Sequence, residues 1–136
     1  MGKDAMKSLA IKYTVTTRDH AQITGLLNDP KLCCHTSNEV LRSLRERLQH
    51  AECVDASQVS GELVSMNSPF YLQDQTTGEV IKHWLCYPDA AGYAANDLSI
   101  LSPLGAQILG CRLGDEVVVD DANGRRRRFT VLRILA

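Results

Sequence analysis

The chain has 136 residues, 44% of them hydrophobic, which suits one globular domain or one domain with a small appendage. Its 15 Lys and Arg residues nearly balance 16 Asp and Glu residues, so a net charge of -1 excludes a generally basic nucleic-acid binder. No apolar run reaches the ~18 residues of a membrane span, and residues 1–7 contain no signal-peptide core. With five cysteines, an odd number, we expect a protein of the reducing cytoplasm.

Residues 1–58 predict a strand followed by two helices. Residues 9–15 are rich in β-branched and aromatic side chains and favour a short strand. Thr16 stands three residues before Asp19, which resembles a capping box and predicts a helix to about Leu27. Pro30 then ends helical geometry, because a proline disfavours it in the preceding residue.

The second predicted helix begins with a capping box formed by Thr36 and Glu39. Its apolar residues recur every three or four positions and form a narrow seam: Leu41, Leu44, Leu48 and Ala51. Such a seam suits one partner helix, so the two helices predict a short antiparallel hairpin stabilised by tertiary packing. The seam lasts barely two heptads, which favours a monomer or weak dimer. Polar residues 55–58 form a linker, which divides the chain into domains 1–58 and 59–136.

Residues 59–136 predict an antiparallel β-sheet with one short helix. The expected strands are residues 61–66, 69–74, 79–87, 98–101, 116–120 and 126–135. Gly78 suits a turn that needs positive φ, and Asn123-Gly124 is a strong hairpin signal. Ser102-Pro103 is a good helix start, with Gly110 at the end of that helix. The whole chain therefore belongs to the α+β class.

Three short blocks in this region carry a family resemblance: Ser102-Pro103-Leu104-Gly105, Ile108-Leu109-Gly110 and Leu113-Gly114-Asp115-Glu116-Val117. Their order resembles the C-terminal domain of the Gre transcription factors, GreA and GreB. Residues 64–68 and 85–88 look more like a sister branch, Rnk, the regulator of nucleoside diphosphate kinase. The resemblance covers residues 59–136 well and residues 9–58 in outline.

The resemblance implies an FKBP-like antiparallel sheet wrapped on one helix and preceded by a coiled-coil hairpin. It also implies a transcription regulator that binds RNA polymerase at the rim of the secondary channel and meets DNA or RNA only through the polymerase. The docking residues would be Leu101, Ser102, Pro103 and Leu104. In GreA and GreB an acidic residue precedes the Ser-Pro pair and contributes to this contact. Leu101 stands there instead, as an apolar residue does in the Rnk branch.

The same resemblance places acidic residues at the hairpin tip, where they help hold a catalytic Mg²⁺ for transcript cleavage. Residues 28–36 offer Asp29 as their one carboxylate, with Lys31 two positions away. Because Mg²⁺ requires several converging oxygen ligands, we expect polymerase binding without cleavage. An active cleavage factor is the alternative. A peptidyl-prolyl isomerase is a weaker rival, since aromatic residues, which line such pockets, are only 5% of the chain.

Arg125, Arg126, Arg127 and Arg128 form the one charge run in the chain. A two-residue Asn123-Gly124 turn would place Asp121 opposite Arg126 and Asp120 opposite Arg127, as stabilising cross-strand pairs. A nucleic-acid or polymerase contact through this run is the other interpretation.

Cys33-Cys34-His35 is too tightly spaced for a structural zinc site, and no second ligand pair accompanies it. No histidine has a recognisable nucleophile beside it in the sequence. We therefore expect no catalytic residue, metal or cofactor.

Overall fold

The computed structural model describes residues 13–55, 57, 63–91, 96–120 and 123–135. The elements of the first half are β1 (Thr14–Thr16), α2 (Thr17–Leu27), α3 (Pro30–Cys33), α4 (Asn38–His50) and β2 (Glu52–Val54). Those of the second half are β3 (Pro69–Asp74), β4 (Val80–Cys86), the 3-10 turn η2 (Pro88–Ala90), β5 (Asp97–Ser99), α5 (Pro103–Ile108), β6 (Glu116–Asp120) and β7 (Arg126–Ile134). Helices and strands are thus mixed as α+β, as predicted.

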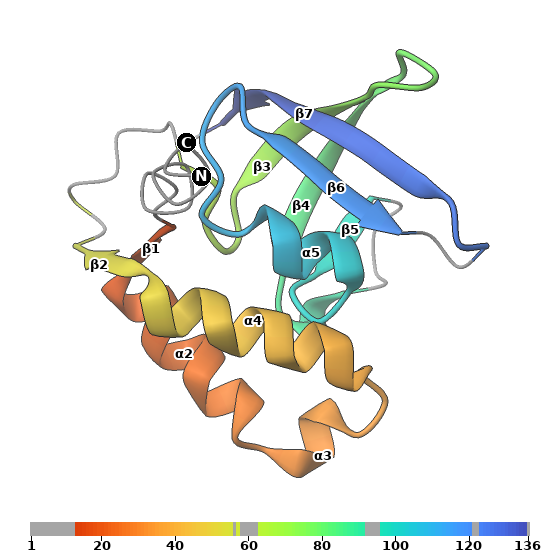
Figure 1. Ribbon diagram of the computed structural model, residues 1–136. Coiled ribbons are helices and arrows are strands. Elements are labelled where there is room, and N and C mark those ends of the chain that lie inside the picture. Colours follow the sequence, from red (N-terminus) through yellow and green to blue (C-terminus); the bar gives the residue numbers. More distant parts are fainter. Residues whose placement is uncertain (1–12, 56, 58–62, 92–95, 121–122, 136) are drawn as a thin grey trace, which may run out of the picture.

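A curled five-stranded sheet with the order β5-β4-β3-β7-β6 forms the second half, and α5 lies across one of its faces (Figure 1). β3, β4, β7 and β6 pair antiparallel, but β5 pairs parallel with β4 through Trp84 and Asp97. The prediction of a purely antiparallel sheet was therefore wrong at this edge. After Cys86 the chain returns to the level of Trp84 before β5 begins, and no residue pattern in the connection indicates that direction.

Helices α2 and α4 lie side by side and run in opposite directions (Figure 1). At one end His20 Nε2 lies 3.0 Å from the carbonyl oxygen of Leu48. At the other end Arg45 Nη2 donates to the carbonyl oxygen of Leu27 at 2.8 Å. The short helix α3, which the sequence did not predict, joins them.

Strands β1 and β2 pair parallel where this helical segment begins and ends, with Thr14 opposite Glu52 and Thr16 opposite Val54. The first strand was expected at residues 9–15, of which 9–12 lie outside the described residues. In the described part the strand is Thr14–Thr16, so it ends one residue later than predicted. β2 was not predicted, because three residues directly after a helix carry too little pattern to indicate a strand.

The predicted start of α2 is confirmed and that of α4 was wrong by one residue. Thr16 Oγ1 accepts from Asp19 N at 3.0 Å, as a cap should. In α4 the cap is Ser37, whose Oγ accepts from Val40 N at 3.2 Å, so Thr36 does not cap the helix. The buried stripe of α4 is accordingly Val40, Leu44 and Leu48, while Leu41 and Ala51 are only partly buried. Burial of Val40 selects this start.

One hydrophobic core continues from the helices into the sheet. Ile23 and Leu44 are fully buried in the same cluster as Phe70, Leu85 and Ile108. Several polar contacts cross this junction, among them two made by charged side chains of the helices. Asp19 Oδ2 accepts from Met66 N at 3.0 Å, and Arg47 Nη2 donates to the carbonyl oxygen of Gln107 at 2.7 Å.

The strand predicted at residues 61–66 is absent from the described part, residues 63–66. Leu63 forms an isolated bridge with Arg112, and residues 61–62 lie outside the described residues. Val64 N donates to Cys111 O at 2.9 Å, and Gly110 N donates to Val64 O at 3.0 Å. The apolar run thus reflects a buried irregular segment, whose backbone groups find partners outside the sheet.

The β6–β7 register also differs from the prediction. Asp120 lies opposite Arg126, and Val119 lies opposite Arg127. Asp120 therefore does not face Arg127, and Asp121 lies outside the described residues. The physical reason is burial, because opposite residues of an antiparallel pair share one face. The buried Val117 needs Phe129 opposite it, and a two-residue turn would put Thr130 there.

Candidate functional site

The turn into α5 contains the residues that the sequence singled out for docking, 101–104, and we call them the docking edge. Ser102 caps α5, because its Oγ accepts from Gly105 N at 3.0 Å. The same hydroxyl donates to Ser99 O at 2.6 Å. Leu101 N donates to Ser99 Oγ at 3.1 Å. Three hydrogen bonds in succession therefore fix this turn onto the end of β5.

Gly105 brings α5 unusually close to β5. A Cβ atom added at Gly105 would lie 1.9 Å from the carbonyl oxygen of Ser99, far inside van der Waals contact. The carbonyl belongs to the backbone of the same turn, so it has little room to move. Only glycine fits without a shift of the backbone, so α5 packs directly against the end of β5.

The docking edge differs in exposure from residue to residue. Pro103 is exposed at the first position of α5, while Leu101 and Leu104 are half-buried and pack on the core. Beside Pro103 lies a groove of about 290 Å³ between α4, α5 and β6. The carboxylate-bearing residues Glu39 and Asp120 both line it. Sequence reasoning missed this groove, since no local signal connects residues so distant along the chain.

At the tip of the helical segment, Asp29 is a helix cap. Its Oδ1 accepts from Lys31 N at 3.0 Å, and Pro30 is the first residue of α3. The tip carboxylate is therefore already engaged in holding the backbone. Cys33 is buried with Sγ donating to Leu26 O at 3.3 Å, and Cys34 is exposed. Within the described ranges, no group of three or more His, Cys, Asp or Glu residues could hold a metal ion.

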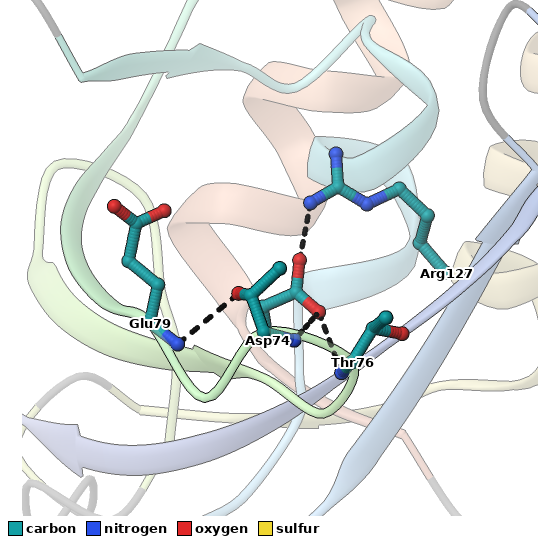
Figure 2. Close-up of polar contacts among 5 residues, drawn as sticks. Asp74, Thr76, Glu79 and Arg127 are labelled. Atoms are coloured by element: carbon teal, nitrogen blue, oxygen red, sulfur yellow. Dashed lines mark hydrogen bonds and ion pairs between the residues drawn. The ribbon is translucent and has the colours of Figure 1, made fainter.

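In the arginine run, Arg127 points to the core side of the sheet and binds Asp74. Figure 2 shows the Asp74 carboxylate between Arg127 and the backbone of Thr76, whose N–H donates at 2.8 Å. Asp74 is only 4% exposed. The hydrogen bond from Arg127 lowers the pKa of the Asp74 carboxyl below its usual value, with the Thr76 N–H adding to the effect. Arg127 therefore has a structural role, because it holds the buried Asp74 carboxylate.

Two further arginines of the run make exposed ion pairs across β6 and β7. Arg126 Nε lies 3.4 Å from Asp120 Oδ1, and Arg128 Nη1 lies 3.8 Å from Glu116 Oε1. Pairs of this kind stabilise a protein by only about 0–1 kcal/mol. These pairs place carboxylates beside two of the four arginines and balance part of the charge of the run.

Taken together, a curled mixed sheet, one glycine-packed capped helix and a preceding pair of helices define a small α+β protein with one rigid, exposed turn. The family model described as "Transcription elongation factor, GreA/GreB, C-term" matches residues 58–136, more than half of the chain. The chain belongs to this family.

Relatives agree with this assignment. The chain is 34% identical over 82 residues to transcription elongation factor GreA of Solidesulfovibrio magneticus, covering 60% of this chain and 50% of that protein. It is 27% identical over 116 residues to the regulator of nucleoside diphosphate kinase of Escherichia coli, covering 85% and 83%. The chain thus spans about half the length of the curated GreA relatives it matches, and most of the length of the second relative.

Solved structures show the same fold. A prokaryotic transcription elongation factor GreA/GreB from Nitrosomonas europaea superposes with a TM-score of 0.75 at 25% identity, covering 93% of this chain and 99% of that one. GreA factor homolog 1 of Thermus thermophilus gives a TM-score of 0.50 at 21% identity, covering 93% and 100%. Within the described residues, no helix has the length and apolar character needed to cross a membrane.

Proposed function

We propose that this chain is a transcription regulator of the Gre and Rnk type, which binds RNA polymerase through the docking edge at the rim of the secondary channel. The observation that carries the proposal is the turn at Ser102. Its cap, its bond to Ser99 and the glycine-only contact at Gly105 present Pro103 in one fixed geometry. A preorganised edge loses little freedom on binding, which favours a protein–protein contact.

The finer description of the fold belongs to this proposal. In it, residues 1–58 supply a short helical hairpin and residues 59–136 supply an FKBP-like domain that docks. Support comes from the antiparallel α2 and α4 and from the curled sheet carrying α5. The protein acts in the cytoplasm, where its polymerase partner works.

Binding is tested with purified chain and core RNA polymerase in a pull-down followed by titration. Pro103→Glu adds charge to the docking edge at a helix position that tolerates Glu well, so the fold is retained. Val80→Glu is the matched control, because Val80 is exposed on β4 away from that edge. We expect Pro103→Glu to abolish retention and Val80→Glu to leave it unchanged, with identical circular dichroism. Absence of wild-type binding at micromolar concentration overturns the proposal.

We further propose that the bound chain does not stimulate transcript cleavage. Asp29 caps α3, and Lys31 beside it adds the wrong charge for a Mg²⁺ site. The assay uses backtracked elongation complexes with labelled RNA, with wild type compared with Asp29→Ala. Cleavage above the intrinsic polymerase rate that disappears in Asp29→Ala would establish the alternative, an active cleavage factor.

A further inference from the structure

A second cavity shares Gln107 and Val118 with the groove beside Pro103 but extends toward Tyr13 and the segment before β6. Its volume is about 490 Å³, within the range of small-molecule sites. The polar side chains that line it come from distant parts of the chain: Tyr13, Arg47, Gln107, Arg112, Asp115 and Glu116. None of residues 101–104 lines it.

Arg47 is a largely buried cation that forms no ion pair with the carboxylates of the described residues. Its Nη2 donates to Gln107, at 2.7 Å to the backbone oxygen and 3.3 Å to Oε1, and its Cζ lies 3.7 Å from the centroid of the Tyr13 ring. Nη1 is buried and has no hydrogen-bond partner in the described part of the chain. No ion pair reaches Arg47 from any described Asp or Glu. Burial removes water from the guanidinium, which is the main reason that the pKa of Arg47 is lowered.

A buried guanidinium without a carboxylate partner destabilises the folded state unless another group stabilises its charge. The Tyr13 ring offsets part of that cost, because a cation over an aromatic face is attracted to it. An anion in the cavity would offset the rest, and it would give Nη1 the acceptor that it lacks.

A second arginine, Arg112, also lines the cavity, and it is exposed. Arg112 Nη2 donates to Thr14 Oγ1 at 3.0 Å, and no described carboxylate forms an ion pair with it. The two acidic residues of the lining already have partners. Asp115 Oδ2 accepts from Arg112 N at 2.8 Å, and Glu116 Oε1 lies 3.8 Å from Arg128 Nη1. Glu116 is thus paired with an arginine outside the lining, and Asp115 accepts a backbone hydrogen bond.

We propose that this cavity is a binding site for a small oxyanion, a phosphoryl or carboxylate group held by Arg47 and Arg112. Guanidinium groups suit both chemistries, because their planar N–H donors match pairs of anionic oxygens. Arg47 stands on α4, and Arg112 stands in the segment before β6. A bound anion therefore joins the helical segment to the sheet. This site is independent of the docking edge and does not require polymerase binding.

The test is the thermal unfolding of the full chain in sodium pyrophosphate, in sodium citrate and in sodium chloride at equal ionic strength. Pyrophosphate probes the phosphoryl source and citrate the carboxylate source. We expect one of them to raise the unfolding temperature in a saturable manner beyond the chloride control, since a ligand of the folded state alone stabilises it. Equal shifts in all three salts overturn the site.

Variants locate the effect. Arg47→Met and Arg112→Met remove one charge each but keep the apolar stem, and Arg42→Met removes a charge from the exposed side of the same helix. Calorimetric titration should show roughly tenfold weaker binding for each pocket variant and no change for Arg42→Met. If Arg47→Met does not fold, Arg112→Met decides the question. Undiminished affinity in Arg112→Met or in a folded Arg47→Met contradicts the proposal.

Discussion

Helices α3 and α5 begin in the same way but occupy different surroundings. Each has a polar cap followed by proline, Asp29-Pro30 in α3 and Ser102-Pro103 in α5. α3 has four residues, of which only Cys33 is buried. α5 has six and buries Gly105, Ala106 and Ile108. The same local signal thus marks a helix start in both places, and only tertiary contact decides which start becomes a rigid surface.

Among the variants that test this comparison, Gly105→Ala should have the largest effect on stability. A Cβ atom there meets the Ser99 carbonyl at 1.9 Å, so the helix and β5 must separate. We expect the free energy of unfolding to fall by about 3 kcal/mol in urea denaturation, at the upper end of overpacking effects.

Gly25→Ala in α2 is the control for that variant. Nothing lies within 4 Å of a Cβ at Gly25, so alanine should raise the free energy of unfolding by up to about 1 kcal/mol through helix propensity. A similar loss of the free energy of unfolding in both variants would show that the close contact at Gly105 is not its cause.

A third helix start, that of α2, is tied to the sheet side by a buried carboxylate. Asp19→Ala leaves Met66 N without its acceptor and should lower the free energy of unfolding by about 2 kcal/mol at pH 7. Asp19→Asn retains an acceptor and should not show this loss. Equal losses in the two variants would show that the Met66 contact is not the cause.

Asp19 also predicts a pH dependence. Burial raises the pKa of this carboxyl above 3.8, so the folded protein binds the proton more tightly than the unfolded chain. The contribution to stability is complete below pH 3.8 and is lost as the pH rises through the folded pKa. The pKa of Asp74 is lowered, so its contribution to stability is present at neutral pH and is lost as the pH falls through the folded pKa. The difference between wild type and Asp19→Asn, measured by urea denaturation from pH 3 upward, isolates Asp19.

Ser102→Ala should have a smaller effect on stability and a clear one on binding. Removal of the cap lowers the free energy of unfolding by about 1 kcal/mol. It also frees the turn that orients Pro103, so affinity for polymerase should fall. Unchanged affinity in a polymerase titration would show that the bond from Ser102 to Ser99 is dispensable for docking.

Asp29→Ala should have the smallest effect, about 0.5 kcal/mol, because the cap of a short exposed helix stabilises little besides that helix. Affinity for polymerase should stay at the wild-type value. A loss as large as that of Ser102→Ala, in the same urea series, would remove the distinction between the two helix starts.

Local signals in the sequence were sufficient for several features. Thr16 and Ser102 cap helices as predicted, and Gly78 and Gly110 have positive φ of 75° and 82° where a turn and a helix end were expected. The strands at residues 69–74 and 116–120 have the predicted limits. Each of these depends on residues within one turn or one strand, which is the range over which sequence patterns act.

Features set by distant contacts were missed. Ser37 replaces Thr36 as the cap of α4 because Val40 packs into the core. The parallel pairing of β5 depends on a connection whose path no residue pattern reveals. At the candidate sites the docking edge remains a prediction, and the cavity at Arg47 could not be anticipated, because its two arginines are far apart in the sequence.

The pairing of β1 with β2 has a consequence for how such proteins diversify. These strands join the two ends of the helical segment through a register of only three residue pairs. The entropy of closing a loop grows slowly with its length, by roughly 0.6 kcal/mol for each doubling. The helices between β1 and β2 could therefore be longer or shorter at little cost in free energy, while the pairing of β1 with β2 stays the same. A change in the length of the helical segment would then require no change in the sheet.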